Sequence, residues 1–392
     1  KDKILKERLF GLGNYQGNHG EDVKELYYYL DNLPSHYYME YLYKYPQKAF
    51  PYDQLVKENG KRTRAEPEYE ILDTGVFDND AYFDVHVTYA KQNAKDICIK
   101  ISVTNRGNEP AEITVLPTLW FYNRWQYNSG IKKPAILRRN NSSVKALHNR
   151  LGSKFLYFQE PDDLLFTENE TNLRIVKGIE DDNIFTKDAF HRAIINGEDI
   201  TPFRKKKSGT KCAPVYKINL DAGASQHIYL RLSNKVITDP FAPGFEKVFS
   251  DRKAEADLFY NDLLKSNTGS EKQQIQRQAF AGLLWSKQYY HYDVERWLNT
   301  GDGITQINKG KQTGRNHDWK HLKNQDIISM PDKWEFPWYA AWDLAFQCIP
   351  MALVDPCFAK NQLILIMREW YMKPDGQLPA YEWNFSDVNP PV

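Results

Sequence analysis

The sequence lacks any long apolar run. Its 392 residues contain no stretch of about 18 apolar residues, the shortest length that indicates a transmembrane helix. We therefore expect no membrane as a partner. The opening residues, Lys1–Arg8, also lack the apolar core of a secretory signal peptide. Because the chain does not begin with methionine, this second absence bears only weakly on location.

Cysteine is scarce and neither sign of charge is in excess. The four cysteines, Cys98, Cys212, Cys348 and Cys357, form no CxxC pair and have no metal-ligand spacing. This usage predicts reduced, small buried side chains and favours a cytoplasmic location. With 52 Lys and Arg against 51 Asp and Glu, the formal net charge is +1, so no nucleic acid is expected as a partner.

Motifs for cofactors and metal ions are missing too. No Gly-rich phosphate loop is present, which argues against a nucleotide enzyme. His317, Asp318 and His321 resemble a metal cluster only in composition, and a loop role fits them better. A loop or cap also fits His19 and Asp22 better than a metal pair. We therefore expect neither a cofactor nor a metal.

What the sequence has in abundance is aromatic side chains, which make up 14% of the residues and include 10 Trp and 25 Tyr. Each Tyr or Trp offers a flat apolar face with a polar tip. Such faces suit sugar rings, whose C–H faces are apolar and whose edges carry hydroxyls. Large cores and surface tyrosines explain the composition as well, so composition alone leaves both interpretations open.

Residues from about 69 to 235 have the alternation typical of β-strands. Turns rich in Gly, Asn, Asp and Pro separate them. Many short strands with few helical stretches between them predict a large antiparallel sandwich. The predicted strands are 81–89, 97–103, 113–121, 154–159, 172–176, 215–220 and 227–233.

After Asp239-Pro240 the hydrophobic period becomes helical. An amphipathic linker helix is predicted over 245–264. A second helix is predicted from an N-cap at Ser270 to about residue 290, and a third from Asp355-Pro356 to about Trp370. The sequence thus predicts an all-β half followed by an all-α half.

The densest cluster of chemically active side chains is residues 332–343, with three Trp, one Tyr, one Phe and three carboxylates. Glycoside hydrolysis requires one protonated carboxyl and a second carboxylate. Aromatic walls raise the pKa of such an acid by desolvating its charged form. Asp343, directly after Trp342, has these surroundings. The alternative is that Trp334, Trp338 and Trp342 form one buried helical stripe beside a surface or capping Asp343.

The segment 330–346, MPDKWEFPWYAAWDLAF, resembles the acid-bearing motif of glycoside hydrolase family 63, which contains processing α-glucosidase I and the bacterial mannosylglycerate hydrolases. Further stretches that resemble the bacterial members are 17–25, 41–47, 209–211 and 376–383. The resemblance implies an N-terminal β-super-sandwich (1–238), a helical linker (239–268) and the beginning of an (α/α)6 barrel (269–392).

The same resemblance assigns roles to particular residues. Asp343 matches the general acid of the family. The family's general base is a Glu much nearer the C-terminus of the barrel, and no position of this chain matches it. Glu382 looks like a substrate-site residue instead. Segments that line the sugar site match Trp338, Tyr339, Trp342, Gln377, Glu382 and Trp383.

The implied function is inverting hydrolysis of an α-linked glucoside or related α-glycoside, with an oligosaccharide or small glycoside as substrate. A glycoside phosphorylase of similar architecture and a non-catalytic carbohydrate-binding protein are the alternatives. The periodicity after residue 240 gives a linker and about three or four further helices. An (α/α)6 barrel contains more, so we expect this chain to be an inactive fragment that lacks the second carboxylate.

Overall fold

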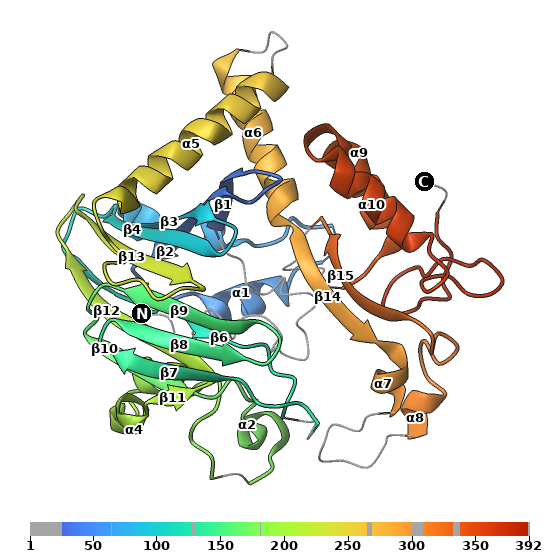
Figure 1. The fold of residues 1–392 in the computed structure, drawn as a ribbon, viewed down its shortest axis with the longest axis horizontal. Helices are drawn as coiled ribbons and strands as arrows, with labels where there is room; N and C mark the ends of the chain where they lie inside the picture. The colour runs from blue at the N-terminus through green and yellow to red at the C-terminus, as the bar shows by residue number, and fades with distance from the viewer. Residues whose placement is uncertain are drawn as a thin grey trace. The chain divides into compact units, whose positions relative to one another are not determined.

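The computed structural model describes residues 26–63, 65–126, 130–180, 182–264, 269–299, 309–331 and 338–390 (Figure 1). The described residues form two compact units. The first contains 26–28 and 37–254, and the second contains 29–36 and 255–390. The domain limits at 238 and 268 implied above remain predictions.

The first unit is built around the strands of a nine-stranded sheet with the order β1-β2-β3-β4-β13-β9-β8-β7-β11, although it contains only residues 26–28 of β1. Its central strands pair antiparallel, as in the register of β4 with β13, where Ile101 faces Ile228. The strands are β1 (Leu26–Asn32), β2 (Tyr38–Pro46), β3 (Tyr82–Asn93), β4 (Asp96–Asn105), β7 (Ala135–Asn140), β8 (Ser143–His148), β9 (Gly152–Phe158), β11 (Ser208–Gly209) and β13 (Ser225–Ser233).

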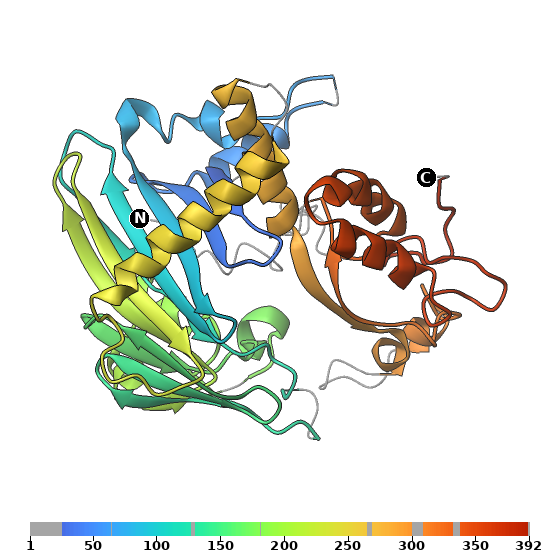
Figure 2. The ribbon, with the colours of Figure 1, turned by 45° about the horizontal axis from the view of Figure 1, so that its top comes forward.

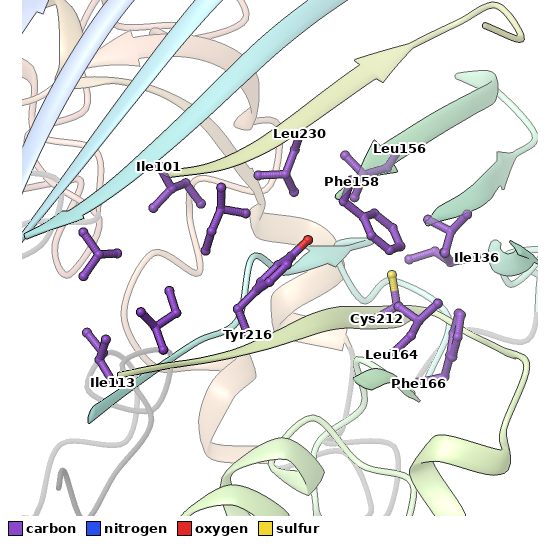
Figure 3. Packing of buried hydrophobic residues seen from close by; sticks show 14 of the residues in the cluster. Ile101, Ile113, Ile136, Leu156, Phe158, Leu164, Phe166, Cys212, Tyr216 and Leu230 are labelled. Carbon is purple, nitrogen blue, oxygen red and sulfur yellow. The ribbon is translucent and has the colours of Figure 1, made fainter. Parts of the chain in front are cut away.

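A second, four-stranded sheet closes the core. It contains β5 (Ala111–Val115), β6 (Leu119–Trp120), β10 (Asp163–Thr167) and β12 (Lys211–Leu220). Figure 3 shows Phe158 and Leu230 of the large sheet facing Phe166 and Tyr216 of the small one. Alternating apolar side chains of both sheets thus meet in one buried layer. The predicted antiparallel sandwich is confirmed.

One predicted strand, 172–176, is wrong, and another, 113–121, is divided into β5 and β6, with residues 116–118 outside any strand. Residues 172–176 belong to a short helix, α2 (Leu173–Lys177). The Asn172 side chain accepts a hydrogen bond from the Ile175 N–H at 3.2 Å, and Gly178 has the left-handed φ of 67°. These cap residues outweigh the strand preference of the Ile and Val between them. The other helices of this unit are α1 (Tyr52–Asn59), α3 (Ala189–Ile194) and α4 (Thr201–Lys205).

The second part of the chain is helical but not all-α. Its helices are α5 (Gly244–Leu263), α6 (Ser270–Trp285), α7 (Val294–Asn299), α8 (Lys309–Gln312), α9 (Ala341–Val354) and α10 (Pro356–Ile366). Helices α9 and α10, drawn in red, lie side by side in Figures 1 and 2. Helix α5 begins in the first unit and confirms the helix predicted over 245–264.

A two-stranded antiparallel sheet, β14 (Lys287–Asp293) with β15 (Lys323–Ser329), contradicts the all-α prediction. It follows α6 directly, so α6 ends at Trp285 and not near residue 290. The Tyr-rich sequence of β14 has high strand propensity, but its partner strand lies far along the chain, where local periodicity gives no signal.

Helix ends test two predicted caps. Asp355 caps α10 as predicted, because its carboxylate accepts a hydrogen bond from the Phe358 N–H at 3.1 Å. This helix ends at Ile366, however, before Trp370. Ser270 is not a cap: Gly269 holds that position without a side-chain bond.

None of the helices in the described ranges is long and apolar enough to cross a bilayer. All four cysteines are free thiols. Three are buried as predicted, whereas Cys357 is exposed in the first turn of α10 and corrects the prediction for that residue.

Candidate functional site

Asp343 lies in the first turn of α9. The helix begins after Ala340, whose backbone is extended (φ −145°, ψ 117°). The Asp343 side chain is half-buried, and this burial raises the pKa of its carboxyl, although a hydrogen bond from its own backbone N–H acts in the opposite direction. Desolvation disfavours the charged form of a carboxyl. The position therefore shifts the pKa of Asp343 in the direction that an acid catalyst requires.

The tryptophans around Asp343 do not form the buried helical stripe of the alternative interpretation. Trp338 precedes the first residue of α9, and Trp342 is 40% exposed and packs edge-on against Phe346 at 5.9 Å between ring centroids. Trp334 lies outside the described residues. Asp343 is also not the N-cap, which is Ala340.

The chain segment just before α9 is hydrogen-bonded to residues 380–382. The Ala341 N–H donates to the Ala380 carbonyl at 2.7 Å, and the Glu382 N–H donates to the Tyr339 carbonyl at 3.0 Å. These bonds bring together two of the segments that sequence analysis singled out, the one that precedes Asp343 and the one that carries Glu382.

The Glu382 carboxylate accepts one hydrogen bond and lies near one cationic side chain. The Tyr290 hydroxyl on β14 donates a hydrogen bond to Oε2, and Nη2 of Arg315 lies 3.9 Å from Oε1. Burial and the adjacent Glu382 carboxylate raise the pKa of Tyr290, which therefore stays a neutral donor. Asn316 fixes the backbone here: its amide donates to the Glu382 carbonyl and accepts from the Phe385 N–H at 2.8 Å.

Trp383 is 51% exposed, whereas the neighbouring Trp297 and Trp338 are half-buried. The Arg315 guanidinium lies 3.9 Å from the centroid of its ring and 5.0 Å from that of Trp297. Trp338 meets Trp383 edge-on, with centroids 6.0 Å apart and an interplanar angle of 84°. The indole is thus fixed by its neighbours while half of its surface remains open.

Two other residues that the resemblance placed at the sugar site have structural contacts here. Tyr339 is fully buried between Tyr371 and Phe385, with centroids at 6.0 and 6.2 Å, and burial raises its pKa well above the usual value. Gln377 is half-buried, and its side-chain amide donates to the Ser386 carbonyl at 3.1 Å.

Within the described ranges, no group of three or more His, Cys, Asp and Glu side chains is arranged to hold a metal ion. Asp318 pairs with Lys373, His317 bonds the Gly314 carbonyl at 3.0 Å, and His321 stacks on Trp319. These contacts give the three residues structural roles. His19 and Asp22 lie outside the described residues.

Sequence analysis missed Arg315 and Tyr290. Both lie outside the aromatic segments 332–343 and 376–383. Tyr290 also lies at the end of the region predicted to be a helix. The one available signal was the alternating, Tyr-rich stretch 287–293, which is typical of a strand.

No protein-family model matches the sequence. The chain is 40% identical, over 442 aligned residues, to an uncharacterized protein of Saccharomyces cerevisiae; the alignment covers 100% of this chain and 40% of that protein. The chain thus spans about 40% of the length of the curated relative that it matches.

Two solved structures show a weaker likeness. A polysaccharide lyase is 12% identical, with a TM-score of 0.25 and coverage of 42% of this chain and 22% of its own. A putative kojibiose phosphorylase from the human microbiome is 9% identical, with a TM-score of 0.23 and coverage of 54% and 23%. Both bear the names of enzymes that act on carbohydrates, but neither likeness is close enough to support a fold or a function for this chain.

Proposed function

We propose that this chain is part of a carbohydrate-active enzyme, an inverting α-glycoside hydrolase similar to glycoside hydrolase family 63. Asp343 is its general acid, and the second part of the chain contributes the first helices of an (α/α)6 barrel. The substrate is an α-linked glucoside or a related α-glycoside.

The observation that carries the proposal is the burial of Asp343 and the upward direction of its pKa at the start of α9. A general acid must hold its proton near the working pH, and desolvation of a carboxyl shifts its pKa in this direction. The acid then protonates the glycosidic oxygen as the C–O bond breaks. The segment before Asp343 is bonded to the segment of Glu382 and Trp383, which supply an acceptor and an aromatic face for a sugar.

Inversion requires a second carboxylate that activates water on the opposite face of the sugar ring, about 6.5–9.5 Å from the acid. We assign this role to a Glu outside the present chain, and Glu382 to substrate binding. Glu382 is oriented by the hydrogen bond from Tyr290 and has Arg315 nearby, which suits a group that holds a substrate in place.

The test uses the complete protein and its Asp343→Asn variant on unactivated α-glucobioses. We expect the unmodified protein to release the β-anomer first, as observed by NMR, and the variant to lose about two to four orders of magnitude in kcat. Glu369→Gln, which changes an exposed carboxylate after α10, is the matched control and retains full activity.

Near-native turnover by a folded Asp343→Asn protein removes Asp343 from the role of acid. Release of sugar 1-phosphate that requires added phosphate identifies a phosphorylase instead. Sugar binding without cleavage by the complete protein identifies a binding protein.

A further inference from the structure

The Arg315 guanidinium has N–H groups without a hydrogen-bond acceptor among the described residues, and it lies against two tryptophans. The guanidinium lies over the rings of Trp383 and Trp297, and Nη1 is buried without an acceptor among the described residues. A guanidinium carries five N–H donors in a rigid fork. Nη2 has no acceptor within hydrogen-bond distance among the described residues either, and unlike Nη1 it is not fully buried, so it is the N–H group that a ligand can reach.

The neighbouring carboxylate does not fill this gap. Nη2 of Arg315 and Oε1 of Glu382 are 3.9 Å apart, which is too long for a hydrogen bond. Tyr290 donates to the other oxygen, Oε2. Oε1 of Glu382 therefore keeps its lone pairs. Nη2 of Arg315, a donor, and Oε1, an acceptor, are thus neighbours that can both bind a ligand.

The aromatic face completes the arrangement. Arg315 stacks on the indole of Trp383 and Trp338 meets its ring edge-on, yet half of the Trp383 side chain remains exposed. An indole held in this way offers an apolar surface of the size of a pyranose ring. The C–H face of a sugar fits such a surface and leaves the ring hydroxyls at its edge.

We propose that Arg315, Glu382 and Trp383 form a subsite for one neutral pyranose ring, in which Arg315 determines specificity. Nη2 of Arg315 donates to one sugar hydroxyl, and Oε1 of Glu382 accepts from the adjacent hydroxyl of the same vicinal diol. This inference rests on the proposed function, in which Glu382 and Trp383 bind the substrate, and it adds Arg315 and the class of group that is recognised.

The charge of the cluster favours a neutral ligand. The guanidinium of Arg315 and the carboxylate of Glu382 have opposite charges and are near neighbours. An anionic sugar, such as a uronate or a sugar phosphate, brings a second negative charge against Glu382 and meets like-charge repulsion there. A hydroxyl pair matches one donor and one acceptor without net charge.

The experiment measures kcat/KM of the complete protein on a neutral α-glucobiose and on its monodeoxy derivatives, with the unmodified protein and Arg315→Lys. In the unmodified protein we expect one or two adjacent deoxy positions to cost tenfold or more, because a buried polar group is left unpaired. Arg315→Lys reduces kcat/KM on the parent sugar and shows no further loss on the sugar that lacks the hydroxyl bound by Arg315.

Arg368→Lys is the matched control, since the Arg368 guanidinium also lies over an indole, that of Trp370 at 5.5 Å. It is expected to leave all deoxy ratios unchanged. If Arg315→Lys fails to fold by circular dichroism, Arg315→Gln, which keeps an N–H donor of smaller reach, replaces it in the same series. Quenching of Trp fluorescence by the same sugars gives a readout of binding that does not require turnover.

Equal deoxy losses in the unmodified protein and in a folded Arg315 variant overturn this inference while the proposed function stands. A preference for the uronate or phosphorylated sugar over the neutral one overturns it too. If the unmodified protein cleaves no α-glycoside, the proposed function fails. The fluorescence titrations then test the subsite without turnover. Absence of any sugar binding overturns both the subsite and the proposed function.

Discussion

The two units of this protein differ in how many of their buried polar atoms lack a hydrogen-bond partner among the described residues. In the sandwich, the side chain of Asn105 is fully used: its oxygen accepts from Gly107 and Gln47 at 2.9 and 2.7 Å, and its amide donates to the carbonyls of Glu109 and Leu220 at 2.8 and 3.0 Å. In the second unit, Nη1 of Arg315 and the Tyr339 hydroxyl are buried without a partner among the described residues. The sandwich also has such an atom, His86 Nε2, but most of the buried polar atoms without a hydrogen-bond partner among the described residues belong to the second unit.

Apolar side chains show the same contrast. The sandwich core draws on both sheets and buries residues such as Phe158 completely. Helix α9 buries Leu344, Cys348 and Met351 on one side, while Trp342, Phe346, Ile349 and Leu353 remain 40–65% exposed on another. A helix that is apolar on two faces is typical of one packed on both sides, which agrees with the proposed barrel.

The largest expected effect separates the two units by stability. Phe158→Ala opens a cavity in a core closed from both sides, and we expect a loss of about 3–5 kcal/mol in the free energy of unfolding. Phe346→Ala removes an aromatic ring that is 48% exposed, so its cost is within about 1 kcal/mol by the area it buries. Denaturant unfolding followed by circular dichroism measures both. Similar losses at the two positions would show that the face of α9 is covered in solution.

A second prediction concerns the aromatic walls. Trp383→Ala removes the half-open indole that Arg315 and Trp338 hold in place. We expect transition-state binding to weaken by about 1–3 kcal/mol, determined from kcat/KM in the complete protein. The folding stability of the variant is measured alongside. Exposed Trp120 of the sandwich is the control, and its replacement by Ala leaves kcat/KM unchanged. An equal effect at Trp120 contradicts the assignment of sugar binding to the second unit.

Tyr290→Phe is expected to have a smaller effect. The change removes one hydrogen bond to the Glu382 carboxylate but keeps the buried ring. A bond to a charged group contributes about 1.5–3 kcal/mol, part of which we expect to appear as weaker substrate binding, because Glu382 loses its fixed orientation. The expected pattern is a raised KM with kcat reduced less than threefold. A loss confined to kcat would instead indicate a role for Glu382 in the chemical step.

The fold was predictable where local signals agreed with tertiary structure. The alternating strands of the sandwich and the Asp355-Pro356 start of α10 depend on neighbouring residues alone. The sheet of β14 and β15 and the contact between Arg315 and Glu382 depend on residues far apart in sequence. Short-range periodicity contains no information about such pairs. At residues 172–176, two caps outweighed the strand pattern.

The pH dependence of stability follows from the direction of the Asp343 shift. Burial raises the folded-state pKa of this carboxyl above the ordinary value of about 3.9. The folded protein therefore binds more protons than the unfolded chain between the two pKa values. Its stability contribution is fully present below the unfolded pKa and is lost as pH rises through the folded pKa.

Asp343→Asn removes this titration. Thermal unfolding at a series of pH values is expected to give equal Tm values near pH 3 and an advantage for the variant that grows until the pH has passed the folded-state pKa and is constant above it. In the active enzyme, the same pKa sets the alkaline limb of kcat/KM, because the acid must be protonated. A variant less stable at neutral pH than at pH 3, relative to the unmodified protein, contradicts the raised pKa.

In the 392-residue chain, the smallest expected effect is at the exposed stripe of α9. Ile349 is 65% exposed and lies one turn from Phe346 and Leu353. In the 392-residue chain, Ile349→Lys is expected to change the free energy of unfolding by no more than about 0.5 kcal/mol, because it buries little area. It is also expected to lower the binding of a hydrophobic dye and the tendency to aggregate, since a charge interrupts the apolar stripe.

In the complete protein, where we propose that barrel helices cover this face, the same change leaves an unpaired buried charge and is expected to cost several kcal/mol. Ile275→Lys on α6, which is 63% exposed, is the control in both forms. An equally small cost for Ile349→Lys in the short and complete chains would mean that no further helix packs on this face of α9.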